Sequence, residues 1–436
     1  MRTVVLMVIV MLIGCRGKIG KDVEEFDESE LDYPRTVNLV EGMKNSGAIL
    51  KLSDIADSIK FIPLEETERT LFASVNYVDI DGENMIVSSY QGQLESYYFR
   101  FNLEGRFLNT IGSIGRGPAE YLGSNISLDT DSKRVILLTW YTTKAFLTFS
   151  YDGKYLGTLP IKKQQYAIKF EFLPGGRIVT DPASSGIVGM LPPDLNGIEL
   201  YDSTGLMVDS VPHPVLQLLS HEKNMRYSTG FSNGNASKTG REAYIHLPDE
   251  DTVYVTSGNT IKPAFIFSKG DYSPGIKDRY KTGSKGKLPY LMDYASRVLV
   301  TATHLYKIQV LDDIQFLFEY NILTDKTRCT SVKATGLERG GIYDFADGAG
   351  FIDDLSGSGR NVFFSIRTGE DGSIWARTMR ANTFKTYFGN DSIPPGVTFD
   401  PIMRDQRLKV ARELRDDGNP VVILIYLKKS SENVKF

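Results

Sequence analysis

The sequence predicts an all-β fold, a six-bladed β-propeller of four-stranded blades, and three observations support this prediction. Short apolar strands alternate with turns containing Asp, Asn or Gly along most of the 436 residues. Four turn glycines, Gly105, Gly153, Gly205 and Gly258, recur at intervals of about 50 residues, which is typical of propeller blades. The chain has 40 glycines and 41% apolar residues, enough for many turns and a large core.

Two hairpins in each repeat make a blade of four strands. In the first repeat, residues 77–80 turn at Asp81-Gly82 into 85–88, and residues 97–102 turn at Glu104-Gly105 into 107–111. Five such units are predicted between about residues 75 and 335, and a sixth, less regular one between 340 and 428.

The two ends of the repeat region predict how the ring closes. Residues 59–64 form a lone strand before the first blade, and residues 421–427 form a lone strand at the end. Pairing them would make the first the outer strand of the last blade and hide an edge. Pro63 suits an outer strand, because it cannot donate to a further ladder.

One short helix is expected in a loop of the C-terminal region. Asp400 is its expected N-cap, Pro401 lies in its first turn, and Gly418 is expected to end it. An apolar stripe predicts that the helix packs on the rim of the ring rather than binding a partner. The stripe consists of Met403, Val410, Ala411 and Leu414.

Residues 1–14 have the features of a lipoprotein signal peptide. Arg2 supplies a positive charge, and the apolar run of residues 4–13 is shorter than the roughly 20 residues that span a bilayer. Residues 12–15 (LIGC) resemble the bacterial lipobox, so Cys15 is the predicted acylated N-terminus. Acyl chains hold a protein on a membrane without a spanning helix, and we expect an outer-membrane lipoprotein facing the periplasm or the cell surface. The alternative is a transmembrane or ordinary secretory segment.

Residues 15–50 are interpreted as the lipidated cysteine and a flexible acidic tether, and residues 51–436 as the propeller. Seven of the eleven residues from Asp22 to Asp32 are acidic, and such a stretch has little to bury. Acids soon after the cysteine resemble the surface-export signal of Bacteroidetes-type lipoproteins, although a plain solvated linker explains them equally well.

Composition excludes several functions. The formal charge of −4 and the absence of a basic patch argue against nucleic acid as a partner. With Cys15 acylated, Cys329 has no intramolecular disulfide partner. The four histidines show no metal-ligand spacing, so neither a metal site nor a cofactor is predicted.

Three segments carry a family resemblance: residues 52–65 (LSDIADSIKFIPLE), 112–121 (GSIGRGPAEY) and 419–422 (NPVV). They resemble the six-bladed β-propeller lipoprotein family of Bacteroidetes-type bacteria, although Ala119 stands where that family has Gly. The resemblance spans roughly residues 50–428. It implies an exported propeller similar to NHL-repeat proteins, with no agreed activity and no catalytic residues to transfer.

No catalytic motif stands out. The segment 112–117 lacks the Gly-Lys-Ser/Thr ending of a phosphate loop, and Pro118 removes an amide, so it is interpreted as the connection between blades 1 and 2. The segment 79–83 lacks the glutamate that a calcium loop requires, because Tyr90 occupies that place. Asp353 and Asp354 would point to opposite faces of a strand.

The lengths of the loops predict the working face. The long segments 181–197, 213–225, 268–295 and 389–418 all connect strand 2 to strand 3, or strand 4 to the next blade. Binding residues concentrate in long loops on rigid scaffolds. The ligand-binding residues predicted on this face are Arg116, Tyr121, Trp140 and Tyr141.

These side chains suit sugar or peptide recognition, because aromatic faces stack and guanidinium groups bind oxygen. For the two consecutive aromatics, inter-blade packing is the alternative. The segment 268–295 adds positive charge, which could attract an anionic ligand, although a solvated loop is an equally good interpretation. Its charged residues are Lys269, Lys277, Arg279, Lys281, Lys285 and Lys287, against Asp271 and Asp278.

Together these features predict a membrane-anchored binding or scaffolding module for a glycan, a peptide or a partner protein. The alternative is an extracytoplasmic propeller enzyme, a glycan lyase or hydrolase, with acids drawn from different blades.

Overall fold

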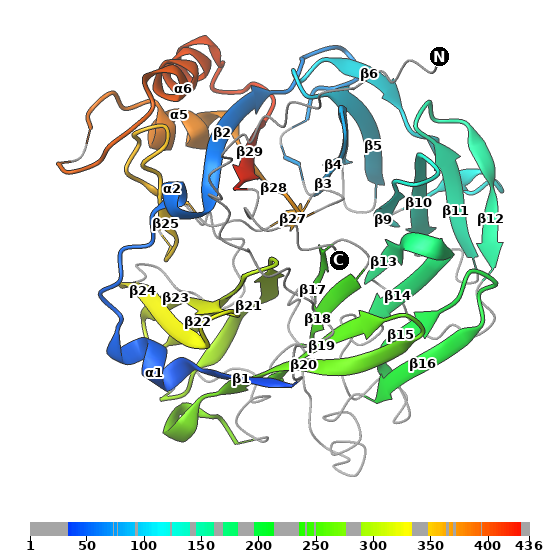
Figure 1. Ribbon diagram of the computed structural model, residues 1–436. Coiled ribbons are helices and arrows are strands. Elements are labelled where there is room, and N and C mark those ends of the chain that lie inside the picture. Colours follow the sequence, from blue (N-terminus) through cyan, green and yellow to red (C-terminus); the bar gives the residue numbers. More distant parts are fainter. Residues whose placement is uncertain are drawn as a thin grey trace, which may run out of the picture.

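The protein, seen here as a computed structural model, is a ring of six antiparallel sheets arranged as propeller blades (Figure 1). The structure describes residues 34–428 except 73, 76, 92–94, 123, 140–144, 161–168, 182–195, 213–234, 240–241, 248–249, 276–288, 334–347, 363–365, 369–371 and 394. The predicted fold class, blade number and four-stranded blades are confirmed.

The first five blades follow one another along the chain, each with its first strand nearest the ring axis. Blade 1 consists of β3 (Tyr77–Asp81), β4 (Asn84–Gln91), β5 (Glu95–Asn102) and β6 (Phe107–Thr110). Blade 2 consists of β9 (Ser124–Asp129), β10 (Arg134–Thr139), β11 (Ala145–Ser150) and β12 (Tyr155–Pro160). Blade 3 consists of β13 (Lys169–Leu173), β14 (Arg177–Asp181), β15 (Asn196–Tyr201) and β16 (Met207–Pro212).

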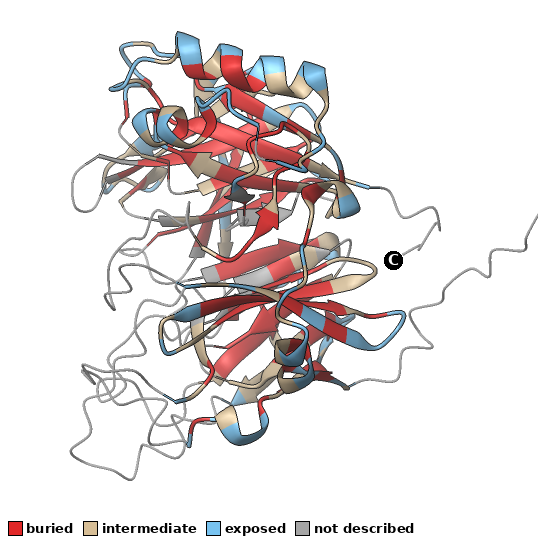
Figure 2. Cartoon of the chain, turned by 90° about the vertical axis from the view of Figure 1, so that its left-hand side faces the viewer, coloured by how far each residue is buried: buried red, intermediate tan, exposed pale blue. Residues whose placement is uncertain are grey.

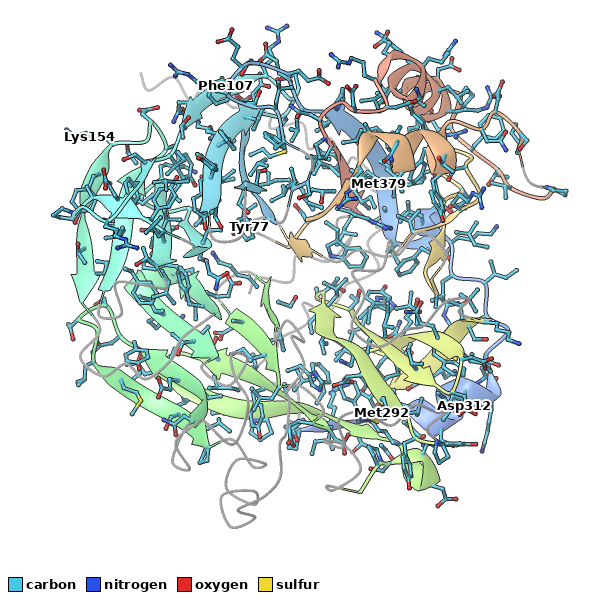
Figure 3. All side chains as sticks on the ribbon, turned by 180° about the vertical axis from the view of Figure 1, so that it is seen from behind. Tyr77, Phe107, Lys154, Met292, Asp312 and Met379 are labelled. Atoms are coloured by element: carbon cyan, nitrogen blue, oxygen red, sulfur yellow. The ribbon has the colours of Figure 1, made fainter. Side chains whose placement is uncertain are left out.

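Blades 4 and 5 continue the ring. Blade 4 consists of β17 (Asn235–Thr239), β18 (Glu242–His246), β19 (Thr252–Ser257) and β20 (Thr260–Ser268). Blade 5 consists of β21 (Met292–Val300), β22 (His304–Leu311), β23 (Ile314–Asn321) and β24 (Lys326–Lys333). In Figure 3, seen from behind, Phe107 and Lys154 lie at the rim and Tyr77 lies nearer the centre.

Blade 6 closes the ring with strands from both ends of the described chain. It consists of β27 (Ile366–Thr368), β28 (Ile374–Met379), β29 (Val421–Leu427) and β2 (Ala56–Pro63). β2 pairs antiparallel with β29, from Ala56 opposite Leu427 to Pro63 opposite Val421, and forms the outer strand. The closure predicted from residues 59–64 and 421–427 is therefore confirmed.

All four repeating glycines adopt positive φ angles, and two of them also pack closely on the preceding blade. Gly105 and Gly153 adopt positive φ angles of 80° and 83°, a region that side chains disfavour. A Cβ at Gly105 would lie 2.2 Å from the carbonyl oxygen of Pro63, and a Cβ at Gly153 would lie 2.3 Å from that of Thr110. At these two positions the turn between strands 3 and 4 abuts the outer strand of the preceding blade, which leaves no room for a side chain.

An N-terminal belt, residues 35–55, runs along the outside of blades 4 to 6 (Figure 1). β1 (Arg35–Asn38) pairs in parallel with β20 as a fifth strand of blade 4. α1 (Leu39–Lys44) then packs on blade 5, where the thiol of Cys329 donates to the carbonyl of Gly42. α2 (Leu52–Ile55) leads into β2. The interpretation of residues 35–50 as tether needs correction, because Val37 and Leu39 are fully buried.

Two further helices lie between β28 and β29, at the rim: α5 (Ala381–Phe388), which the sequence analysis missed, and α6 (Pro401–Glu413). Asp400 caps α6 as predicted, because its carboxylate accepts from the backbone N–H groups of residues 402 and 403. The predicted stop at Gly418 is wrong, since the helix already ends at Leu414, whose backbone is extended. The apolar stripe of α6 packs on the core as expected.

The remaining elements are short: β7 (Ser113–Ile114), β8 (Glu120–Tyr121), β25 (Phe351–Ile352), β26 (Asn361–Val362) and the 3-10 turns η2 (Pro174–Gly176) and η5 (Gly270–Tyr272). Buried positions follow the strands, whereas exposed positions gather at turns and on the outer side of the helices (Figure 2). The core therefore lies between the blades. Within the part of the chain that the structure covers, no helix is long and apolar enough to span a membrane.

Candidate functional site

The two ends of the ring differ in their connections. We call the end where strands 1 and 2, and strands 3 and 4, are joined the turn face, and the opposite end the loop face. Among the described residues, the elements inserted between strands belong to loop-face connections, except for the three-residue η2. These are β7 with β8, η5, β25 with β26, and α5 with α6. The asymmetry predicted from loop lengths is present in the described part of the chain.

The glycine-rich connection from blade 1 to blade 2 holds an internal carboxylate. The backbone N–H of Gly117 donates to Oε2 of Glu120 over 2.8 Å. A Cβ at Gly115 would lie 1.8 Å from the same oxygen, so the loop is moulded around this side chain. Since the carboxylate occupies the space between the glycines, the loop is a blade connection rather than a phosphate cradle. Arg116 lies exposed on it.

Tyr121, predicted to bind ligand, is only 1% exposed. Its hydroxyl donates to the carbonyl oxygen of Ile111 over 2.8 Å, and its ring meets the edge of Tyr98 at a centroid distance of 5.3 Å. Burial raises the pKa of its phenol well above the ordinary value. Its ring serves inter-blade packing, so it does not line a depression together with Arg116. Trp140 and Tyr141 lie outside the described residues, so the binding prediction for them stays a prediction.

A buried charged cluster, which the sequence analysis missed, lies between blades 4 and 5 near the loop face. Nζ of Lys307 lies 3.1 Å from Oδ1 of Asp293 and 3.3 Å from Nδ1 of His246. The Lys307 side chain is 0% exposed and that of Asp293 is 2% exposed. Such a cluster leaves no local motif, because the three residues come from β18, β21 and β22. In Figure 3, the labelled Met292 marks the start of β21.

Hydrogen bonds and opposite charges connect the members of this cluster. An ammonium group can only donate, so Nδ1 of His246 accepts from Lys307, while Nε2 donates to the carbonyl oxygen of Glu250 over 2.8 Å. Burial alone would raise the pKa of Asp293, but the neighbouring charges of Lys307, His246 and Lys269, together with the hydrogen bond from Lys307, outweigh burial and hold that pKa well below its usual range.

The cluster also fixes the base of the connection from blade 4 to blade 5. Lys269 directly follows β20 at one end of this connection, and Asp293 lies near the start of β21 at the other end. The ammonium of Lys269 is buried and lies 2.9 Å from Oδ1 of Asp251. Lys269 therefore belongs to the interior and does not contribute to a cationic ligand surface. Residues 276–288, which carry most of the predicted positive charge, lie outside the described residues.

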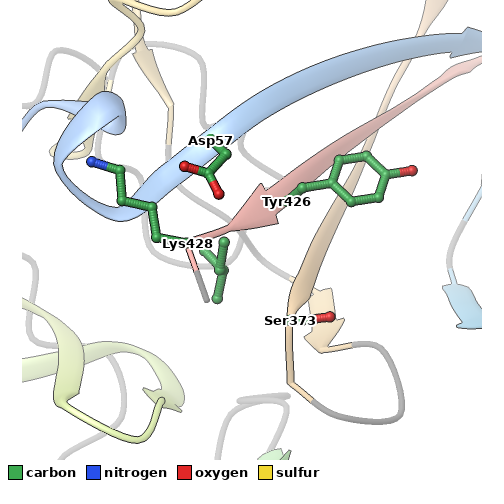
Figure 4. Close-up of a pocket in the computed structure, with 5 residues that line it drawn as sticks. Asp57, Ser373, Tyr426 and Lys428 are labelled. Atoms are coloured by element: carbon green, nitrogen blue, oxygen red, sulfur yellow. The ribbon is translucent and has the colours of Figure 1, made fainter. Parts of the chain in front are cut away.

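A cavity of about 390 Å³ opens at the seam of blade 6, on the turn face (Figure 4). It exists because β29 and β2 come from opposite ends of the chain, so no hairpin covers this position. Its lining consists of Asp57, Ser373, Tyr426, Leu427 and Lys428. In Figure 4 the side chains of Tyr426 and Lys428 point away from each other, on opposite sides of Asp57. The lining does not converge on a common point, as a specific ligand would require.

The described residues contain no group of three or more His, Cys, Asp or Glu that could hold a metal ion. Buried carboxylates in this part of the chain instead accept hydrogen bonds within the fold. The carboxylate of Glu199, for example, accepts from the hydroxyl of Tyr201 over 2.6 Å and from the amide of Asn196 over 2.9 Å.

Comparison with known proteins gives a family and a fold. The family model described as "Domain of unknown function (DUF4934)" matches residues 34–426. The chain resembles the crystal structure of a "Putative exported protein (BF0058)" from Bacteroides fragilis, with 17% identity, a TM-score of 0.62, and coverage of 90% of this chain and 99% of that one. At this identity the likeness concerns the fold alone.

Two weaker likenesses are also to propeller proteins. Virginiamycin B lyase from Staphylococcus aureus has 10% identity and a TM-score of 0.30, covering 55% of this chain and 64% of that one. The β-propeller domain of the Trilobed protease from Pyrococcus furiosus has 9% identity and a TM-score of 0.29, covering 59% and 84%. Both scores are too low to bear on function. No curated protein sequence matches the chain.

Proposed function

This chain belongs to the DUF4934 family, and from that premise we propose that it is an extracytoplasmic binding module. It is anchored in the outer membrane through acylated Cys15 and binds a glycan, a peptide or a partner protein on its loop face. The likeness to an exported protein supports the location outside the cytoplasm. The lipobox-like residues 12–15 support the anchor.

The asymmetry between the two faces is the observation that carries the binding function. On the turn face, β3 and β4 are separated by two residues, and so are β19 and β20. On the loop face, whole helices and strand pairs are inserted into the connections of the same scaffold. Closure of the ring does not require these insertions, and a rigid ring that presents elaborated loops on one side is the usual arrangement of a binding surface.

The enzyme alternative receives less support from the described residues. A glycosidase needs two carboxylates facing a common space, one of them with a raised pKa. The buried carboxylates near the loop face are instead bound within the protein: Asp293 by Lys307, and Glu199 by Tyr201. A binding role therefore fits these residues better than catalysis.

The test uses the full chain carrying Cys15→Ser, probed on glycan and peptide arrays, with product analysis for each hit. Arg116→Ala removes an exposed loop-face cation, and Lys154→Ala removes a cation from the turn between strands 3 and 4 of blade 2. The proposal expects Arg116→Ala to weaken a hit by about tenfold, which corresponds to about 1.4 kcal/mol, and Lys154→Ala to leave it unchanged. Loss of binding only with Lys154→Ala would place the site on the turn face, and product formation would make the protein an enzyme.

A further inference from the structure

We propose that the turn face rests against the lipid surface in which the protein is anchored, so that the loop face points away from the bilayer. This inference rests on the proposed membrane anchor and goes beyond the binding function, because it assigns a partner to the opposite end of the ring. The contact residues are exposed leucines at the turns between strands 3 and 4: Leu108, Leu156, Leu206 and Leu323.

These leucines are exposed at corresponding places on four blades. Leu206 and Leu323 lie within the turns of blades 3 and 5, and they are 51% and 46% exposed. Leu108 and Leu156 lie three residues after the turn glycines of blades 1 and 2, and they are 46% and 49% exposed. Because these four blades surround the ring axis (Figure 1) and their turns lie at one end of it, the leucines suit contact with a broad, flat surface.

The alternation of the outer strands turns two of these leucines outward. The ring of Phe107, which lies at the rim in Figure 3, packs edge-on against Phe101 at a centroid distance of 5.8 Å. Tyr155 packs inward in the same way in blade 2. Neighbouring residues of a strand point to opposite sides, so Leu108 and Leu156 are directed away from these internal contacts.

The N-terminal chain enters the fold from the same end. β20 leads from the turn at Gly258 to the connection with blade 5, so it runs from the turn face to the loop face. β1 pairs with β20 in parallel, and its first residue, Arg35, is therefore its end nearest the turn face. Cys15 precedes Arg35 by 20 residues, which span at most about 70 Å. A lipid anchor on Cys15 thus holds the ring from the turn-face end of β1.

The chemistry of the turn face favours a lipid surface over a protein partner. Each leucine belongs to a different blade, whereas a protein interface needs one contiguous, closely packed patch. A bilayer accommodates separate apolar side chains, because each one enters the headgroup region on its own. The charges beside the leucines are of both signs, so the contact is apolar rather than electrostatic. These exposed residues are Arg106 and Lys154, against Glu104 and Asp152.

The first test compares two exposed residues at opposite ends of β23, a strand about 25 Å long. Leu323 follows its turn-face end, and Ile314, 37% exposed, begins it at the loop face. Leu323→Cys and Ile314→Cys are labelled with bimane in the acylated full chain, since acylated Cys15 and buried Cys329 stay unlabelled. The protein is reconstituted in vesicles of phosphatidylethanolamine and phosphatidylglycerol that contain a spin-labelled lipid as quencher. We expect strong quenching in Leu323→Cys and weak quenching in Ile314→Cys.

The second test removes the apolar contact from the Cys15→Ser chain. The leucine pair Leu206→Ser, Leu323→Ser is compared with the control pair Ile314→Ser, Ile402→Ser, which removes two exposed residues from loop-face elements. Flotation with the same vesicles measures binding. A half-exposed leucine contributes about fivefold to partitioning, so the leucine pair should weaken vesicle binding by about 25-fold and the control pair should leave it unchanged. Melting temperatures should stay unchanged in both pairs, because all four side chains are exposed.

The outcomes separate this orientation from the anchor and from the binding function. Stronger quenching in Leu323→Cys, with weaker vesicle binding of the leucine pair, supports the proposal. Equal quenching at both positions, or vesicle binding insensitive to the leucines, overturns it and leaves the anchor and the loop-face binding function intact. Failure of the anchor itself is detected separately, because the flotation test does not use Cys15.

Two further results would assign the surfaces differently. Stronger quenching in Ile314→Cys than in Leu323→Cys would turn the loop face toward the bilayer and overturn both this proposal and the proposed binding face. A dimer that dissociates in the leucine pair, measured by sedimentation in the absence of vesicle binding, would assign the leucines to contact between copies of the chain and overturn the proposal.

Discussion

Removal of the ammonium of Lys307 should destabilise the ring strongly at neutral pH. The substitution Lys307→Met keeps the length and the apolar stem of the side chain but leaves Asp293, 2% exposed, without its nearest cation. At the observed 3.1 Å, the attraction is about 5 kcal/mol for an effective dielectric constant of about 20. Because Lys269 and His246 compensate in part, we expect the free energy of unfolding to fall by about 3–5 kcal/mol.

The loss of stability in Lys307→Met should be larger at neutral pH than at acidic pH. In the native protein the pKa of Asp293 is lowered, so its contribution to stability is present above the unfolded pKa and is lost as the pH falls toward the folded value. In Lys307→Met, burial acts without its main counterweight and raises that pKa, so a protonated Asp293 relieves the defect. Urea unfolding monitored by fluorescence should therefore show a smaller difference in the free energy of unfolding between Lys307→Met and the native chain at pH 4 than at pH 7.

A matched control separates the charge effect from the loss of any lysine. Lys333 is 76% exposed and pairs with Asp313 at 3.6 Å, and Lys333→Met should change the stability by less than about 1 kcal/mol. The double variant Lys307→Met, Asp293→Asn should recover much of the loss. An equal loss at pH 4 and pH 7, or no recovery in the double variant, would show that Lys307 acts through packing rather than charge.

Three further predictions follow. Gly175→Ala places a side chain at a φ of 78° with open space around it and should lower the free energy of unfolding by about 1 kcal/mol. Gly153→Ala places its Cβ 2.3 Å from the carbonyl oxygen of Thr110 and should lower it by at least about 1 kcal/mol more. Equal melting temperatures of the two variants would contradict the close-approach argument. Cys15→Ser should release the protein from the membrane with its fold intact, and continued membrane retention would refute the lipid anchor. Burial raises the pKa of the Cys329 thiol to about 12. In the Cys15→Ser chain, a thiol reagent at pH 8 should therefore react with Cys329 only when the protein unfolds. Rapid reaction with the folded protein would show that α1 does not cover this thiol.

Sequence reasoning was most successful where one residue type had a single local cause. The turn glycines repeat because all four adopt positive φ, and at Gly105 and Gly153 close packing on the preceding blade also excludes a side chain, so the blade period could be predicted. Ring closure was predictable because two lone strands needed partners. Two of the three segments behind the family resemblance, residues 52–65 and 419–422, serve that closure, since the side-chain amide of Asn419 donates to the carbonyl of Glu65 over 3.0 Å.

The misses arise where the deciding contact is distant in sequence. The belt was assigned to the tether because it directly follows the acidic segment 22–32 and contains few apolar residues. Two of these, Val37 and Leu39, are buried, and their packing partners lie in blades 4 and 5. Tyr121 resembled a ligand contact, yet its environment is set by Tyr98 on another strand. Helix α5 is short, and only the spacing of Phe384 and Phe388, which stack on each other, could have indicated it.

The closure of blade 6 also determines when folding of the ring can be completed. The amide of Asn419 and the carbonyl of Glu65 are 354 residues apart in the sequence. The early strand β2 therefore pairs with β29, the last strand in the described part of the chain. Chain closure over such a distance makes folding slow, and β2 stays without its ladder until β29 has been synthesised. A chain that stops before Val421 lacks the central strand of its final sheet and leaves β2 without a partner. A chain truncated there cannot close its ring, so we expect it to be more easily cleaved by proteases than the closed protein.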